Sequence, residues 1–93
     1  MKYYMLTYFL AEDYMQKRGG FRKDHLSLAD KFYRKGVLLM GGALSRPADK
    51  AVLIFHSEGE NDAKDFVNAD PYVTNGLVES WELREWNVVV GVV

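Results

Sequence analysis

A chain of 93 residues with a net charge of −1 and no cysteine has the size of one small domain. This charge balance argues against a broad basic surface for nucleic acid or anionic membrane, and the missing thiols exclude disulfides and cysteine-based metal sites or nucleophiles. No apolar run approaches the roughly 18 residues that span a membrane, and Glu12 and Asp13 interrupt the first run too early for a signal peptide. We therefore expect one soluble, unprocessed domain over residues 1–93, and the absence of cysteine fits the cytoplasm.

The hydrophobic pattern alternates between strand and helix along the chain. Runs rich in Tyr, Phe, Val, Leu and Ile, with apolar residues on both faces, alternate with two segments whose apolar residues recur at helical spacing. Gly36 ends the first helix and Pro71 ends the second. In chain order the pattern predicts a strand, a helix, two strands, a helix and a strand, at residues 2–10, 21–35, 37–40, 51–57, 62–70 and 77–90.

The connecting segments also carry signals. Residues 11–20 are polar and end in two glycines, which predicts a loop, and residues 43–50 contain Ser, Pro and Asp, which predicts a turn. Gly41-Gly42 predicts a bulge or a close approach of the backbone to a neighbouring group. The apolar residues 88–93 need a partner surface, because an exposed strand of this composition is prone to aggregate.

The predicted order β-α-β-β-α-β is the ferredoxin-like arrangement, an α+β fold with a four-stranded antiparallel sheet and two helices on one face. In this topology the start of the first helix and the end of the second helix lie at the same end of the domain. His25 and Asp70 occupy those two positions, each on the inward stripe of its helix. Since two helices cover only one face of the sheet, we expect the open face to join a second copy in a symmetric homodimer.

His25 and Asp70 together fit acid–base chemistry. Imidazole titrates near neutrality, and a carboxylate that accepts a hydrogen bond from one ring nitrogen fixes the tautomer and stabilises the imidazolium. The alternative for His25 is a ring that bonds a backbone group, and the alternative for Asp70 is an ordinary helix stop before Pro71. An aspartate at a helix C-terminus opposes the helix dipole, at a cost of about 0.3–1 kcal/mol, and therefore calls for a compensating partner.

Further candidates for substrate binding belong to the same end of the domain. Arg22, one turn before His25, and Arg46 are candidates to bind an anion, with solvated surface charge as the alternative. Ser45 precedes Arg46 in the predicted turn. Tyr8 and Tyr72 are candidates to line a pocket, with ordinary packing as the alternative, as expected in so aromatic a chain.

The sequence gives no support for a metal or nucleotide cofactor. The two histidines are far apart in the chain, and neither pair of glycines has the spacing of a phosphate-binding loop. RNA-recognition domains share the predicted topology, but residues 50–56 lack the aromatic and basic pattern of their third strand. We expect no nucleic-acid partner.

Five short motifs follow one another along the chain: Arg22 with His25-Leu26, Gly36-Val37-Leu38-Leu39, Gly41-Gly42-Ala43, Asp70-Pro71-Tyr72 and Gly76-Leu77. As an ordered set they resemble the YCII-related (YciI-like) proteins over nearly the whole chain. This resemblance implies a dimeric α+β barrel of ferredoxin-like subunits with His25 and Asp70 as its catalytic pair. One member of that family is a dehydrochlorinase of a chlorinated hydroxyhydroquinone, and a related barrel family isomerises muconolactone. The family commonly has Gly-Pro near the position of Gly42-Ala43. This chain lacks that proline, so we expect its pocket wall to differ there.

The sequence leads to two hypotheses for a cytoplasmic homodimer with a small cyclic or aromatic organic ligand. In the first, the protein is a cofactor-independent lyase, isomerase or dehydrohalogenase. His25 moves a proton, Asp70 orients His25, and Arg22 or Arg46 receives the developing negative charge. In the second, the protein is a non-catalytic small-molecule binder or accessory protein that uses the same pocket.

Overall fold

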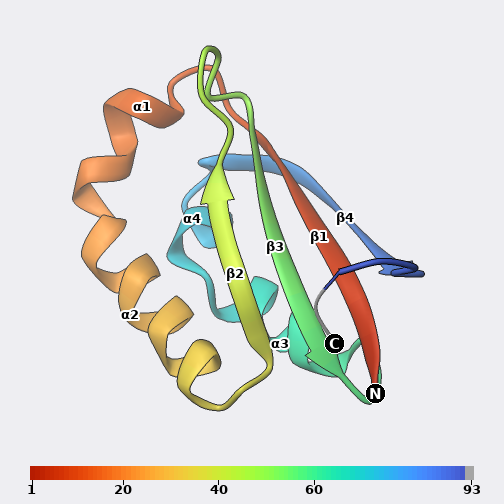
Figure 1. The fold of residues 1–93 in the computed structure, drawn as a ribbon. Coiled ribbons are helices and arrows are strands. Elements are labelled where there is room, and N and C mark those ends of the chain that lie inside the picture. Colours follow the sequence, from red (N-terminus) through yellow and green to blue (C-terminus); the bar gives the residue numbers. More distant parts are fainter. Residues whose placement is uncertain (92–93) are drawn as a thin grey trace.

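The computed structural model describes residues 1–91 and contains a four-stranded antiparallel sheet with helices on one face (Figure 1). The strand order is β2-β3-β1-β4. This arrangement confirms the predicted α+β, ferredoxin-like fold. In chain order the elements are β1 (Lys2–Leu10), α1 (Tyr14–Lys17), the 3₁₀ helix η1 (Arg18–Gly20), α2 (Arg22–Arg34), β2 (Leu38–Ala43), β3 (Lys50–Ser57), α3 (Asn61–Ala69), α4 (Pro71–Thr74) and β4 (Val78–Trp86).

The core lies between the helices and the inner face of the sheet. Strand β1 pairs with β3 on one side and with β4 on the other, and its even-numbered side chains are buried against the helices. Phe66 of α3 meets Phe32 of α2 and Phe55 of β3 edge to face, at ring-centroid distances of 5.3 and 5.7 Å. Burial of each such ring contributes about 1.5–3 kcal/mol. This packing fixes α2 and α3 relative to the sheet, and with them the residues at their ends.

The predicted loop at residues 11–20 is largely helical. It forms α1 and η1, which lead almost without a break into α2 (Figure 1). Tyr14 of α1 is buried and makes an edge-to-face contact with Tyr72, with ring centroids 5.7 Å apart. Tertiary packing therefore gives this segment a helical backbone in spite of its two glycines, which are unfavourable in helices.

The strand registers differ in detail from the predicted ones. In β2 the irregularity falls between Leu38 and Met40 rather than at Gly41-Gly42. The close approach expected of these glycines is found at Gly41, where a Cβ would lie 3.1 Å from Leu53 Cγ. Strand β4 is shorter than the predicted segment 77–90, and its pairing with β1 shifts between Phe9 and Leu10. The last two residues of the predicted apolar tail, 92–93, lie outside the described part of the chain.

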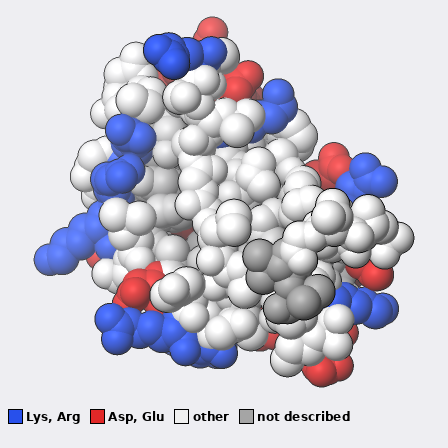
Figure 2. Space-filling model, viewed as in Figure 1, with Lys and Arg blue, Asp and Glu red and all other residues white. Residues whose placement is uncertain are grey.

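The face of the sheet opposite the helices is mostly uncharged. The odd-numbered side chains of β1 from Tyr3 to Phe9 lie on this face half-buried, and Ile54 of β3 lies beside them. Helices α3 and α4 lie behind the sheet in Figure 1, and Figure 2 shows in the same view that charged side chains lie mainly around the rim of this face. None of the helices in residues 1–91 is long and apolar enough to cross a membrane.

Candidate active site

Asp70 occupies the junction between two helices. Helix α3 ends at Ala69, and Pro71 begins α4, so Asp70 follows one helix and caps the next. Its side chain is fully buried, and Oδ1 accepts a hydrogen bond from the backbone N–H of Tyr72 at 3.0 Å. The carboxylate that opposes the dipole of α3 thus satisfies a free N–H group at the start of α4. The sequence predicts Asp70 as the end of a helix, but it does not predict that Asp70 caps a second one.

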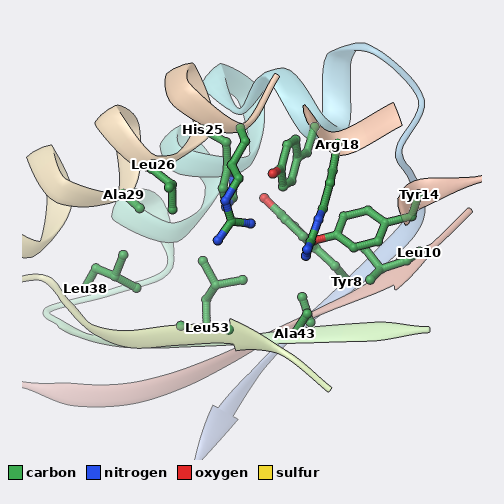
Figure 3. A pocket seen from close by; sticks show the side chains of 15 residues that line it. Tyr8, Leu10, Tyr14, Arg18, His25, Leu26, Ala29, Leu38, Ala43 and Leu53 are labelled. Atoms are coloured by element: carbon green, nitrogen blue, oxygen red, sulfur yellow. The ribbon is translucent and has the colours of Figure 1, made fainter. Parts of the chain in front are cut away.

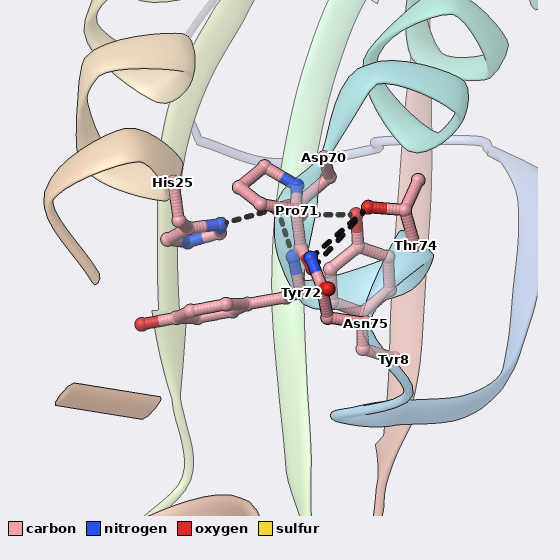
Figure 4. A network of polar contacts seen from close by, with 7 residues as sticks. All are labelled: Tyr8, His25, Asp70, Pro71, Tyr72, Thr74 and Asn75. Carbon is pink, nitrogen blue, oxygen red and sulfur yellow. Dashed lines mark hydrogen bonds and ion pairs between the residues drawn. The ribbon is translucent and has the colours of Figure 1, made fainter. Parts of the chain in front are cut away.

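The structure brings His25 into contact with Asp70. The His25 Nδ1 atom lies 2.8 Å from Asp70 Oδ1, although the two residues are 45 positions apart in the chain (Figure 4). When the neutral imidazole donates from Nδ1 to this carboxylate, the lone pair is left on Nε2. The His25 side chain is 16% exposed and lines a cavity. It is therefore set up to exchange a proton through Nε2.

Tyr8 completes the set of donors around the carboxylate. Its hydroxyl donates a hydrogen bond to Asp70 Oδ2 at 2.7 Å (Figure 4). Burial raises the pKa of the Tyr8 phenol far above its ordinary value, and the charge of Asp70 and the hydrogen bond to it act in the same direction. The phenol therefore stays protonated and donates. Tyr8 lines the cavity as expected, but its hydroxyl is engaged with Asp70.

The imidazole of His25 is also held by aromatic contacts. The Tyr72 ring stacks on it at a centroid distance of 3.9 Å and an interplanar angle of 7°. Phe66 approaches it edge to face at 6.3 Å. Tyr72 therefore contributes to the site twice, with its backbone N–H on Asp70 and its ring on His25. These contacts leave the imidazole little freedom to rotate away from Asp70.

His25 lines a cavity of about 310 Å³ between the helices and the inner face of the sheet (Figure 3). This volume is at the lower end of the range for small-molecule sites, about 300–1,000 Å³. One part of the wall carries polar, aromatic and cationic side chains, namely Tyr8, Tyr14, Arg18, Arg22, His25 and Tyr72. Another part is apolar, with Leu10, Leu26, Ala29, Leu38 and Leu53 among its residues. The cavity suits a small ring that also carries a polar group.

Not every predicted site residue lies at this cavity. Tyr8, Arg22, His25 and Tyr72 line it, and Asp70 is buried behind His25. Ser45 and Arg46 lie exposed on the hairpin between β2 and β3 and are not among the lining residues. Their part in substrate binding stays a prediction, as does the catalytic role of His25 and Asp70.

Sequence reasoning missed Arg18 and Tyr14, which also line the cavity. They belong to the segment that was expected to be a loop. The signal was nevertheless present, because Tyr14, Arg18 and Arg22 are spaced four residues apart and continue the stripe that reaches His25. Residues four apart on a helix share a face.

Comparison with known proteins agrees with the fold and the motifs. The YCII-related domain matches residues 1–87. This chain belongs to the YCII-related family. Among curated proteins, none matches it.

Two solved structures are similar to this YCII-related protein. One is a 5-chloro-2-hydroxyhydroquinone dehydrochlorinase from Burkholderia phenoliruptrix AC1100 in complex with 2,5-dihydroxybenzoquinone, with a TM-score of 0.76, 18% identity, and coverage of 91% of this chain and 93% of that chain. The other is a protein from Agrobacterium tumefaciens, with a TM-score of 0.62, 18% identity, and coverage of 96% of this chain and 94% of that chain. At this identity the likeness shows the fold.

The described part of this YCII-related chain offers no obvious place for a metal ion. Within residues 1–91, no three His, Asp or Glu side chains gather as ligands for one.

Tyr8→Phe is expected to change the alkaline stability of the YCII-related protein. The pKa of Tyr8 is raised in the folded state. The Tyr8 hydroxyl therefore makes its full contribution to the free energy of unfolding below the ordinary phenol pKa of about 10, and this contribution is lost as the pH rises above that value. We expect Tyr8→Phe to lower the free energy of unfolding by about 1–3 kcal/mol near neutrality. Above pH 10 the difference in this free energy between wild type and Tyr8→Phe should narrow by up to about 1.4 kcal/mol per pH unit.

Urea unfolding measured from neutral to alkaline pH checks this expectation. Tyr33→Phe is the matched control, because Tyr33 is 61% exposed. If wild type and Tyr8→Phe lose stability in parallel above pH 10, the buried hydroxyl does not contribute in the way described.

Proposed function

We propose that the cavity beside His25 is the active site of a cofactor-independent enzyme that moves a proton on a small cyclic organic substrate. The observation that carries this proposal is the 2.8 Å contact between His25 Nδ1 and the fully buried Asp70. That contact leaves Nε2 as the nitrogen for a substrate. Among the described residues, no group is bonded to Nε2.

The proposed reaction begins when Nε2 takes a proton from an acidic carbon or hydroxyl of the bound ring. The resulting imidazolium lies against the buried Asp70 carboxylate, which stabilises its charge. The electron pair left on the substrate then has two outcomes. If the proton returns to another ring atom, the product is an isomer. If the pair forms a double bond while a bond to a neighbouring leaving group breaks, the product is an unsaturated ring and a free anion such as chloride.

Tyr8 supports this chemistry as a positioning residue. Its hydroxyl donates to Asp70 Oδ2, while the Tyr72 N–H and His25 Nδ1 both lie at Oδ1. These contacts fix the carboxylate in one rotamer, so the imidazole has a single place to bond. Fixed dipoles and charges of this kind need no rearrangement during the reaction.

The structural neighbour supports the substrate class. The dehydrochlorinase from Burkholderia phenoliruptrix acts, by its name, on a chlorinated hydroxyhydroquinone and was solved with a quinone. A ring of that kind is small and planar, and a cavity of about 310 Å³ with apolar walls is of suitable size for one.

A panel of small cyclic compounds tests the proposed function. Chlorinated hydroquinones, hydroxyquinones and unsaturated lactones are incubated with the protein in D₂O, and ring hydrogens are followed by NMR together with chloride release. We expect exchange or elimination with at least one class. Binding without exchange by any compound of the panel would favour the second hypothesis, a non-catalytic small-molecule binder.

We further propose that the open face of the sheet joins a second copy of this chain. Support comes from the apolar part of this face, where Met5 and Ile54 lie side by side in register, and from the exposed Met40 and Trp86, with the charged Arg84 beside Met5 on the edge strand β4. An apolar face of this extent is unusual on a soluble monomer. A two-fold arrangement would cover it in both copies.

Met5→Arg is expected to weaken this dimer, because the substitution places a charged side chain on the apolar part of the face that the second copy would bury. The protein should sediment as a dimer at micromolar concentration, and Met5→Arg should shift it toward the monomer with unchanged far-UV circular dichroism. Asp65→Arg, on the exposed side of α3, is the control and should remain dimeric. A monomeric wild-type protein would contradict the proposal.

A further inference from the structure

The cavity contains two arginines without carboxylate partners. Within residues 1–91, neither Arg18 nor Arg22 takes part in an ion pair. The Arg18 guanidinium lies 5.9 Å from the Tyr14 ring centroid, and Figure 3 shows it reaching into the cavity beside that ring. Arg22 is exposed and Arg18 is half-buried, so water screens both charges in part, but together they give this side of the cavity a positive potential that attracts a small anion.

Tyr72 adds an independent sign of a missing ligand. The residue is only 3% exposed, and within residues 1–91 its hydroxyl makes no hydrogen bond of full geometry, although the Arg22 side chain lies close enough to act on it. Figure 4 shows this hydroxyl pointing away from the cluster around Asp70, and Tyr72 is one of the residues that line the cavity. A buried hydroxyl without a partner is costly and uncommon in native structures. A ligand oxygen in the cavity would satisfy it.

The protonation state of Tyr72 suits an anionic ligand. Burial and, to a smaller degree, Tyr14 raise the pKa of the Tyr72 phenol, while the nearby Arg22 and Arg18 act in the opposite direction. The net effect is upward, so the hydroxyl keeps its hydrogen at neutral pH and donates it. The group that fits beside it is therefore an acceptor, and the two guanidinium groups make a negatively charged acceptor the best match.

We propose that Arg18, Arg22 and Tyr72 form an anion-binding subsite for the carboxylate of a small planar ring acid. The guanidinium fork matches the two oxygens of a carboxylate. The apolar wall, with Leu10 and Leu53, suits the ring. The carboxylate would hold the ring beside His25, which stacks on the same Tyr72. This inference rests on the proposed function for the role of the bound acid as a substrate, but the subsite itself is defined by binding.

Benzoate and benzamide are the probes, because they have nearly the same shape and differ in charge. Binding to the whole protein is measured by calorimetry and by amide chemical shifts. We expect benzoate to bind at least about tenfold more tightly than benzamide to the wild type, and Arg18→Gln and Arg22→Gln each to lower benzoate affinity by about tenfold. Tyr72→Phe should lower it by about three- to tenfold, and benzamide affinity should change little in the arginine variants.

Lys23→Gln is the matched control, since Lys23 is an exposed cation next to Arg22 that is not among the cavity-lining residues. Lys23→Gln should leave benzoate binding unchanged. The inference is overturned if benzoate does not bind, if it binds no better than benzamide, or if Lys23→Gln weakens benzoate as much as Arg18→Gln does.

The same measurements separate this inference from the proposed function. His25→Asn should keep the preference for benzoate, because His25 is not part of the anion subsite. A protein that prefers benzoate and shows no exchange with any ring acid contradicts the enzymatic proposal alone. A protein that exchanges neutral rings through His25 and shows no preference for benzoate contradicts the anion subsite alone.

Discussion

His25→Asn is expected to lower the turnover of a substrate from the panel by about 10²–10⁴-fold, the usual contribution of a general acid or base. The asparagine amide can overlay Nδ1 of the imidazole and still donate to Asp70 Oδ1. The substitution therefore keeps the hydrogen bond to the buried carboxylate and removes Nε2 together with the part of the ring that stacks on Tyr72. Turnover should fall with little change in KM, because ligand binding does not need the lost nitrogen.

A melting curve and a rescue experiment separate catalysis from packing at this position. His25→Asn should melt only a few degrees below the wild type, since its hydrogen bond to Asp70 is kept and the ring contact with Tyr72 is lost. His25→Ala leaves a gap over the Tyr72 ring, and added imidazoles should restore part of the turnover there. If rates with substituted imidazoles follow their basicity, the ring acts in proton transfer. Unchanged turnover in His25→Asn would rule out His25 as the base.

The position of this site was predictable because it depends on the topology and on the inward-facing stripes of the two predicted helices. Helical periodicity placed His25 near the start of one helix and Asp70 at the end of the other, both facing inward. The order of strands and helices then put these two ends together, and the 2.8 Å contact is what that geometry produces. No side-chain detail was needed, since the packing of α2 and α3 on the sheet leaves few alternatives.

The helical turn that carries Arg18 was not predicted, because local propensity and tertiary packing disagree there. Gly19 and Gly20 disfavour a helix by about 1 kcal/mol each. The burial of Tyr14 against Tyr72 offsets that cost and aligns α1, η1 and α2. A sequence-based prediction weighs the glycines and cannot see a contact with a residue far along the chain.

The role of Tyr8 was beyond sequence reasoning for a different reason. The strand pattern placed Tyr8 on one face of β1, and that face proved to be the inner one. Whether its hydroxyl meets a substrate or the carboxylate depends on the rotamer of Asp70, which is set by the cap of a four-residue helix. Such short helices leave almost no periodic signal in a sequence.

Asp70→Asn is expected to reduce turnover by about 10²–10⁴-fold as well, for an electrostatic reason. The amide oxygen can still accept from the Tyr72 N–H and from His25 Nδ1, so the shape of the site survives. The negative charge that stabilises the imidazolium is gone, and the Tyr8 hydroxyl has to turn its hydrogen away and accept from the amide NH₂ where it normally donates to a carboxylate. We expect a loss of about 1–3 kcal/mol in the free energy of unfolding from this mismatch.

Asp65→Asn is the matched control for Asp70→Asn, because it removes an exposed carboxylate from α3, the helix that Asp70 follows. It should change neither turnover nor stability. Nitrogen chemical shifts of the His25 side chain supply a readout of positioning: the wild type should hold its hydrogen on Nδ1, and Asp70→Asn should show a mixture of tautomers. Full turnover in Asp70→Asn with reduced stability would make the carboxylate a structural group.

Combining Asp70→Asn with Tyr8→Phe shows whether Tyr8 acts through the carboxylate. Alone, Tyr8→Phe should lower turnover by about tenfold, since it removes one of the hydrogen bonds that fix Asp70. In the Asp70→Asn background the same substitution should cost almost nothing, because the group that Tyr8 supports has already lost its charge. Multiplicative losses in the double variant would mean that the Tyr8 hydroxyl acts on the substrate directly.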